Sequence, residues 1–163
     1  MGLRTGITVE DPDFPALLLL NAVYGAGVTS KLFVNVREKR SLCYYASSTI
    51  EKYKGIMVVS SGIAFDRYET ARDAILEELD ACRRGEISEE ELASARTMVL
   101  SALRASLDAP AQLDDFYIGA SVARVLDIPE LMERIAALTV RELADAARKI
   151  TLDTVYFLKG ETA

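Results

Sequence analysis

The run ALLLLNAVYG, residues 16–25, is the feature that most constrains how this chain can fold. It is apolar almost all round, so it predicts a helix that other elements surround on every side. Asp11 is expected to cap this helix, with Pro12 at its first position, and the helix is expected to end at about Tyr24. The run is too short to cross a bilayer. With 163 residues, half of them hydrophobic, the chain can bury such a helix inside one core.

The other elements follow in an uneven order along the chain. Strand patterns occupy residues 3–9, 43–51, 56–65 and 154–160, and the middle two form a hairpin. Helix patterns occupy residues 31–39, 67–84, 88 onward, 112–126, 127 onward and 139–150. Capping boxes begin three of these helices, at Ser88 with Glu91, Asp127 with Glu130, and Thr139 with Glu142. This order predicts one α+β domain over residues 1–163, an antiparallel or mixed sheet with helices packed on one face.

The net charge of the chain limits the classes of partner that it is expected to bind. The net charge is −6, and nucleic acids and anionic membranes both select basic surfaces, so neither is expected as a partner. Cys43 and Cys82 lie too far apart for a metal or redox motif, and both are expected to be buried, reduced and structural. The acidic charge and the lack of an export signal favour a cytoplasmic location.

The absence of histidine bears most directly on activity. Without an imidazole there is no histidine-based triad and no general base that titrates near neutral pH. Catalytic zinc is usually held by two or three histidines, so no metal site is expected within this chain. Catalytic residues are therefore not expected here, and the chain alone is not expected to be an active enzyme.

Arg37 and Tyr44 form the one pair that suggests chemistry. They lie seven residues apart, across a predicted boundary between a helix and a strand. An arginine offers a rigid fork of donors and a tyrosine adds one hydroxyl, so together they could bind the backbone carbonyls of an extended peptide. The same donors could stabilise a developing oxyanion. The alternative is that both are surface side chains at the end of a helix.

The segment NAVYGAGVTSKLFVNVREKRSLCYYASSTIEKYKGIMVVSSGI, residues 21–63, resembles the insulinase (pitrilysin) family of zinc peptidases, which includes the mitochondrial processing peptidases. It is similar to the non-catalytic half of those enzymes, and the resemblance extends through the later helices. Members carry a glycine-rich turn, then Ser-x-Leu-Phe, then Arg-Glu-Lys-x-x-Leu-x-Tyr. The matching residues here are Gly25, Gly27, Ser30, Leu32, Phe33, Arg37, Glu38, Lys39, Leu42 and Tyr44.

This resemblance implies a clamshell of two related halves around an extended peptide. One half binds zinc through His-x-x-Glu-His, and the other supplies an arginine and a tyrosine that hold the substrate backbone, matched here by Arg37 and Tyr44. The glycine-rich loop is matched by Gly25 and Gly27, with Ala26 where a third glycine is frequent. Zinc is then expected in a partner domain, and this chain is expected to be a fragment of a longer insulinase-family chain.

The partners implied by the resemblance are an extended peptide substrate, which would pair with a sheet edge, and a catalytic insulinase-family domain or subunit, or a second copy of this chain. The alternative function is a scaffolding pseudo-peptidase domain that stabilises a partner without any catalytic contribution. In that case the arginine and tyrosine would be vestigial.

Overall fold

The computed structural model describes residues 1–160, apart from the side chains of residues 112, 115, 120 and 122. Its sheet has four strands in the order β2-β3-β1-β4, and every neighbouring pair is antiparallel. The strands are β1 (Gly2–Arg4), β2 (Tyr45–Glu51), β3 (Ile56–Gly62) and β4 (Thr151–Thr154). The predicted α+β class is therefore confirmed, and the sheet is antiparallel rather than mixed.

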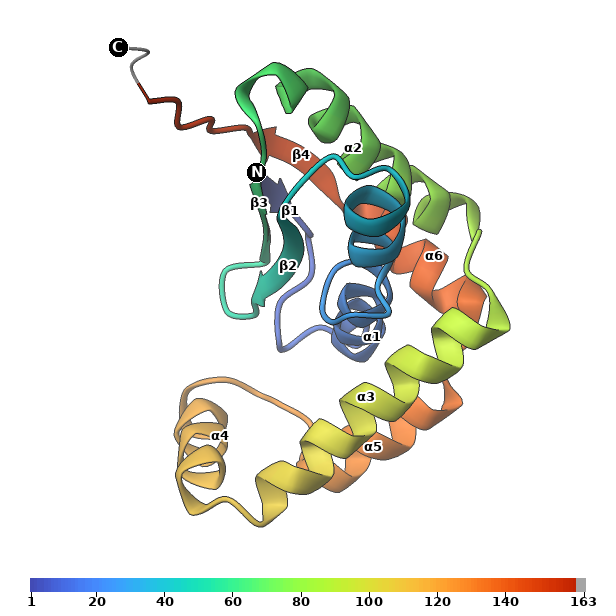
Figure 1. Cartoon of the computed structure of the whole chain (residues 1–163). Coiled ribbons are helices and arrows are strands. Elements are labelled where there is room, and N and C mark those ends of the chain that lie inside the picture. The colour runs from blue at the N-terminus through green and yellow to red at the C-terminus, as the bar shows by residue number, and fades with distance from the viewer. Residues whose placement is uncertain (161–163) are drawn as a thin grey trace.

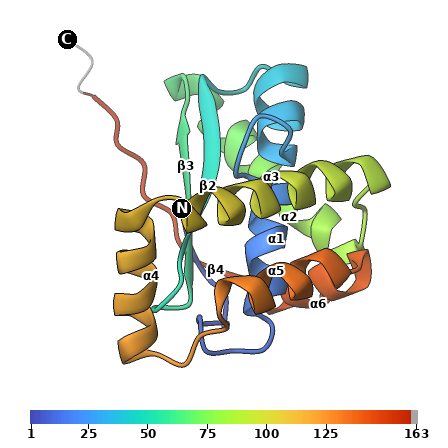
Figure 2. The same ribbon diagram turned by 90° about the horizontal axis from the view of Figure 1, so that it is seen from below.

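Most of the helices gather on one side of this sheet, and α4 lies apart from them (Figure 1). The helices are α1 (Phe14–Tyr24), the π-helix η1 (Leu32–Lys39), the short 3₁₀ turn η2 (Phe65–Arg67), α2 (Tyr68–Arg84), α3 (Glu89–Leu107), α4 (Pro110–Val122), α5 (Ile128–Ala137) and α6 (Val140–Lys149). Seen from below, α3 crosses α1 with α5 and α6 beside it, and α4 projects from the far end of α3 (Figure 2). None of the helices in the described part of the chain is long and apolar enough to cross a membrane.

The central position predicted for α1 is confirmed. Every residue of this helix is buried except Leu18, and Leu17, Leu19 and Leu20 are fully enclosed. The inner face of the sheet covers one side of this core, because alternate strand residues such as Met57 and Val59 point inward. The residues between them on β2 and β3 are mostly exposed, which leaves the outer face of the sheet open.

All three predicted capping boxes are present, at the starts of α3, α5 and α6. The predicted start of α1 was wrong. The Asp11 carboxylate accepts hydrogen bonds from the backbone N–H and the hydroxyl of Thr8, at 2.6 and 2.8 Å, and so closes the preceding turn. The helix begins three residues later at Phe14, with Pro15 in its first turn.

The last strand also differs from its prediction. β4 covers Thr151–Thr154, whereas the sequence pattern placed the strand at residues 154–160. Residues 155–158 are extended and alternate in burial, with Val155 and Phe157 turned inward and Tyr156 and Leu158 exposed. These residues form no strand pairing, because the pairing of β4 with the neighbouring strand β1 ends where Gly2 lies opposite Thr154.

Candidate functional site

The element that carries Arg37 is the π-helix η1, where an ordinary α-helix was expected. Its wider turn is seen where the N–H of Arg40 donates to the carbonyl of Asn35, five residues earlier, at 3.2 Å. Ser30 stabilises the turn that leads into this helix, since its hydroxyl accepts from the N–H of Phe33 and donates to the carbonyl of Gly27. Helices of this kind are rare and occur frequently at functional sites.

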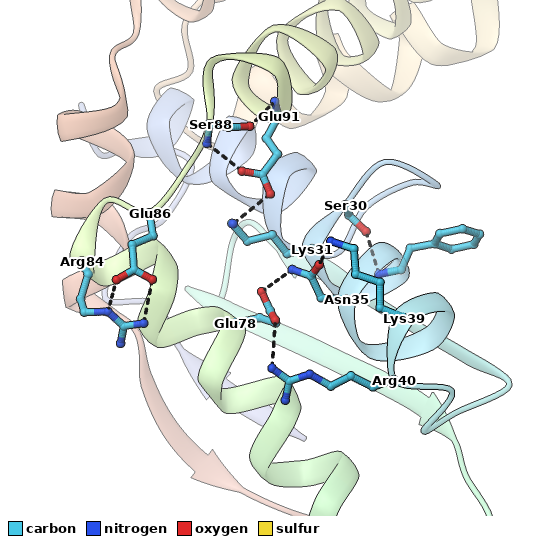
Figure 3. A network of polar contacts seen from close by, with 11 residues as sticks. Ser30, Lys31, Asn35, Lys39, Arg40, Glu78, Arg84, Glu86, Ser88 and Glu91 are labelled. Atoms are coloured by element: carbon cyan, nitrogen blue, oxygen red, sulfur yellow. Dashed lines mark hydrogen bonds and ion pairs between the residues drawn. The ribbon is translucent and has the colours of Figure 1, made fainter.

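A network of charged side chains fixes η1 against α2 and the start of α3 (Figure 3). The Asn35 amide donates to the buried carboxylate of Glu78 at 2.8 Å, and Arg40 lies 3.9 Å from that carboxylate. Lys31, also buried, pairs with Glu91 at 2.9 Å. Buried charges are tolerated when they are paired, and breaking such a pair is costly. The network therefore holds the helix that presents Arg37 in one position.

Glu91 belongs both to this network and to the capping box of α3. Burial by itself would raise the pKa of its carboxyl group, but hydrogen bonds from Lys31 and from the backbone and side chain of Ser88 outweigh that effect. The pKa of Glu91 is therefore lowered from its usual value of 4.5. The carboxylate stays ionised near neutral pH, as its pairing with Lys31 requires.

Arg37 and Tyr44 lie next to each other, and the side chain of Arg37 is hydrogen-bonded to the backbone of Tyr44. The Nε of Arg37 donates to the carbonyl of Tyr44 at 3.0 Å, and the N–H of Tyr44 donates to the carbonyl of Gly62 at 2.7 Å. The guanidinium carbon of Arg37 also lies 4.4 Å from the ring centre of Phe33, one turn back in η1. Among the described residues no hydrogen bond uses the two terminal nitrogens of Arg37, one of which lies 3.9 Å from Glu38, and Tyr44 as a residue is 77% exposed.

The glycine turn lies directly beside this pair. A Cβ on Gly25 would come within 2.4 Å of the Ser48 hydroxyl and 2.8 Å of the Ser48 backbone nitrogen, so only glycine fits against β2 there. Gly27 has φ = +116°, a backbone conformation that residues with a Cβ rarely adopt. The N–H of Ser48 donates to the carbonyl of Gly25 at 3.1 Å, which joins the turn to the outer edge of β2.

Two open hollows meet at the Arg37–Tyr44 pair. The first, of about 360 Å³, will be called the glycine-side hollow, and it is bordered by Gly25, Gly27, Arg37 and Tyr44 together with Val28, Phe33, Tyr45, Ala46 and Ser47. The second, of about 640 Å³, will be called the Arg67-side hollow, and it is bordered by Arg37, Glu38, Ser41, Leu42, Cys43, Tyr44, Ala64 and Arg67. All four predicted site residues thus border the glycine-side hollow. Two of them, Arg37 and Tyr44, also border the Arg67-side hollow.

The two cysteines differ from each other. Cys82 is fully buried, as expected, but Cys43 is only partly buried and borders the Arg67-side hollow. Burial raises the pKa of the Cys43 thiol, with the Ser61 side chain and the charge of Arg37 acting in the opposite direction. Cys43 is thus protonated at neutral pH, which disfavours a nucleophilic role.

The residues around the site can bind and orient a ligand. Within residues 1–160 as described, no three His, Cys, Asp or Glu side chains lie together as a metal site would require. Arginine and tyrosine donors suit a peptide carbonyl or an oxyanion. Sequence reasoning missed Arg67, since a single arginine after a predicted strand carries no signal until the fold places it on the same hollow as Arg37.

Comparison with known proteins gives a consistent result. A family model described as "Peptidase M16 inactive domain" matches residues 1–99. The "Probable inactive metalloprotease YmfF" of Bacillus subtilis is 39% identical over 161 residues, covering 98% of this chain and 38% of the relative. An "Uncharacterized zinc protease" of Rickettsia bellii is 26% identical over 137 residues, covering 81% of this chain and 33% of the relative.

Solved structures extend the similarity to the whole fold. The crystal structure of a conserved protein from Enterococcus faecalis superposes with a TM-score of 0.93 at 34% identity, covering 99% of this chain and 39% of that one. The chain therefore spans about two fifths of the length of the Bacillus subtilis relative and of the Enterococcus faecalis protein.

Proposed function

Because the chain belongs to the peptidase M16 family, as an inactive domain of these zinc proteases, we propose that it holds the backbone of an extended peptide for hydrolysis at a zinc site elsewhere. The observation that carries this proposal is the Arg37–Tyr44 pair at the junction of two open hollows. The terminal nitrogens of Arg37 and the hydroxyl of Tyr44 would donate to one carbonyl of the peptide.

The outer edge of β2 supplies main-chain groups for the same peptide. The N–H of Ser48 points away from β3, toward Gly25, and alternate residues of an antiparallel strand present their main-chain groups to the same side. Ala46, two residues earlier, therefore presents its groups toward the glycine-side hollow, which it lines. An extended peptide that paired with Ala46 would pass Tyr44 within a residue or two.

Zinc would have to be held by another domain or subunit. The chain has no histidine, and its described carboxylates and thiols do not gather into a group of three. These residues do not fit a catalytic zinc site, which needs three protein ligands around the metal. A catalytic M16 domain, in the same polypeptide or in a partner, is the source that we propose.

We propose further that the chain is one domain of a longer protein, and an open slot in the sheet supports this. Met1 and Val59 exchange both backbone hydrogen bonds, at 2.8 and 2.7 Å. Ser61, two residues on, presents its main-chain groups to the same side, where a slot of about 70 Å³ separates it from Val155 and Phe157. A strand in line with β1 would fill this slot and pair with both neighbours.

The proposed function is tested by turnover in the assembled enzyme, formed with a partner that carries His-x-x-Glu-His. We expect Arg37→Gln and Tyr44→Phe each to lower kcat/KM by at least about tenfold, since loss of one oxyanion donor commonly costs this much or more. Arg84→Gln and Tyr117→Phe are matched controls on exposed residues away from the site. Unchanged turnover in both site variants would favour the scaffolding function instead.

A further inference from the structure

The Arg67-side hollow brings together two arginines from different parts of the chain. Arg37 comes from η1, and Arg67 ends the 3₁₀ turn η2 that follows β3, where its N–H donates to the carbonyl of Ala64 at 3.0 Å. Both side chains line the hollow. The side chain of Arg37 is 38% exposed, and that of Arg67 is 58% exposed. Glu38 is the one carboxylate among the residues described as lining it.

These two arginines are paired less tightly than others on the surface. Arg37 lies 3.9 Å from Glu38, and Arg67 lies 3.9 Å from Asp66. By contrast, Arg40 and Arg84 reach their carboxylates at 2.7 and 2.6 Å, distances typical of charge-assisted hydrogen bonds. The donors of Arg37 and Arg67 thus remain largely unused, although both border the same hollow.

We propose that this hollow binds a carboxylate of the peptide, with Arg67 as the residue that sets the preference. The inference rests on the proposed function, because the peptide backbone must first be held at Arg37 and Tyr44. Planar guanidinium groups bind carboxylates with two parallel hydrogen bonds, a geometry that fits two arginines facing one cavity. The preferred substrates are then peptides that carry an acidic group close to the bound carbonyl.

The position of that acidic group follows from the geometry. Tyr44 borders both hollows, and successive residues of an extended peptide advance by about 3.3 Å. The acidic residue would therefore lie within one or two residues of the carbonyl held by Tyr44. The glycine-side hollow has Val28, Phe33 and Tyr45 on its border and would take an apolar side chain on the other side of that carbonyl.

The experiment measures the Kd of fluorescent octapeptides for the 163-residue chain by anisotropy at low salt. Three peptides share one backbone: a neutral amidated peptide, the same peptide with one internal Glu, and the neutral peptide with a free C-terminal carboxylate. We expect the Glu peptide to bind about fivefold more tightly than the neutral peptide, the upper range for a solvent-exposed ion pair. Arg67→Gln should remove this difference, whereas the control Arg84→Gln should retain it.

The outcomes separate the two proposals. If all three peptides bind with equal Kd and Arg67→Gln changes nothing, the carboxylate preference is overturned while peptide binding stands. If no peptide binds to the chain, or if Arg37→Gln leaves binding unchanged, the proposed function fails and the preference fails with it. In a third outcome, only the peptide with the free C-terminal carboxylate binds more tightly than the neutral peptide, and Arg67→Gln removes this difference. That result would support the site and identify its ligand as the end of a peptide chain.

Discussion

Replacing Gly25 by alanine tests how closely the glycine turn packs against β2. The added Cβ would lie 2.4 Å from the Ser48 hydroxyl, 2.8 Å from its Cβ and 2.8 Å from its backbone nitrogen. A rotation of the Ser48 side chain cannot relieve the contact with the backbone nitrogen, so the turn or the strand must move. Overpacking of this kind costs about 1–3 kcal/mol.

The same movement would weaken the hydrogen bond from the Ser48 hydroxyl to the side-chain oxygen of Asn21, which is buried and 2.7 Å long. Loss of such a bond costs about 1 kcal/mol, so the free energy of unfolding should fall by about 2–4 kcal/mol. For a chain of this size each kcal/mol lowers Tm by about 2–4 °C, and calorimetry should show a fall of about 5–15 °C.

Gly2→Ala is the matched control, because a Cβ at Gly2 would meet only the carbonyl of Thr154, at an ordinary 4.0 Å. Its Tm should stay within about 2 °C of the unmodified chain. A Gly25→Ala variant that melts together with this control would refute the close packing described above. The turn would then not need glycine to lie beside Tyr44.

Three other predictions concern the core, the charged network and the slot in the sheet. Leu20→Ala should lower the free energy of unfolding by about 2–5 kcal/mol in urea titrations, because Leu20 is fully buried, whereas Leu158→Ala, at an exposed residue, should change it by less than about 0.5 kcal/mol. The lowered pKa of Glu91 contributes stability that is present above its usual value of 4.5 and is lost as the pH falls through the folded pKa. Glu91→Gln should therefore reduce the fall in stability as the pH drops below about 4.5, and an unchanged pH profile would contradict this. The amide of Ser61 should exchange quickly with deuterium in this chain and slowly in a longer protein that fills the slot, as mass spectrometry of both would show.

The parts of the fold that could be predicted from the sequence were those with a local cause. The three capping boxes are local because a side chain at one position bonds the backbone three residues away. The burial of α1 on all sides could be predicted because it has no polar stripe to turn toward water. The hairpin of β2 and β3 could be predicted from two adjacent strand patterns and a short turn that ends in Gly55.

The features that could not be predicted from the sequence depend on residues that lie far away along the chain. Residues 155–158 have the apolar alternation of a strand, but whether they form a ladder depends on β1, about 150 residues earlier. Arg67 gains its place in the site only because β3 pairs with β2, which packs against η1. The π-helical turn of η1 has no pattern of its own, since Leu32 and Val36 are buried on one face as in an ordinary α-helix.

The π-helix also fixes the direction in which Arg37 projects. Each residue of an α-helix advances the side chain by about 100° around the axis, and a π-helical turn contains an additional residue, so each residue of η1 advances it by less. Deleting one residue between Leu32 and Val36 would therefore rotate Val36 and Arg37 together by about a quarter of a circle relative to Leu32. Either Val36 would leave the core, or the guanidinium of Arg37 would leave the carbonyl of Tyr44.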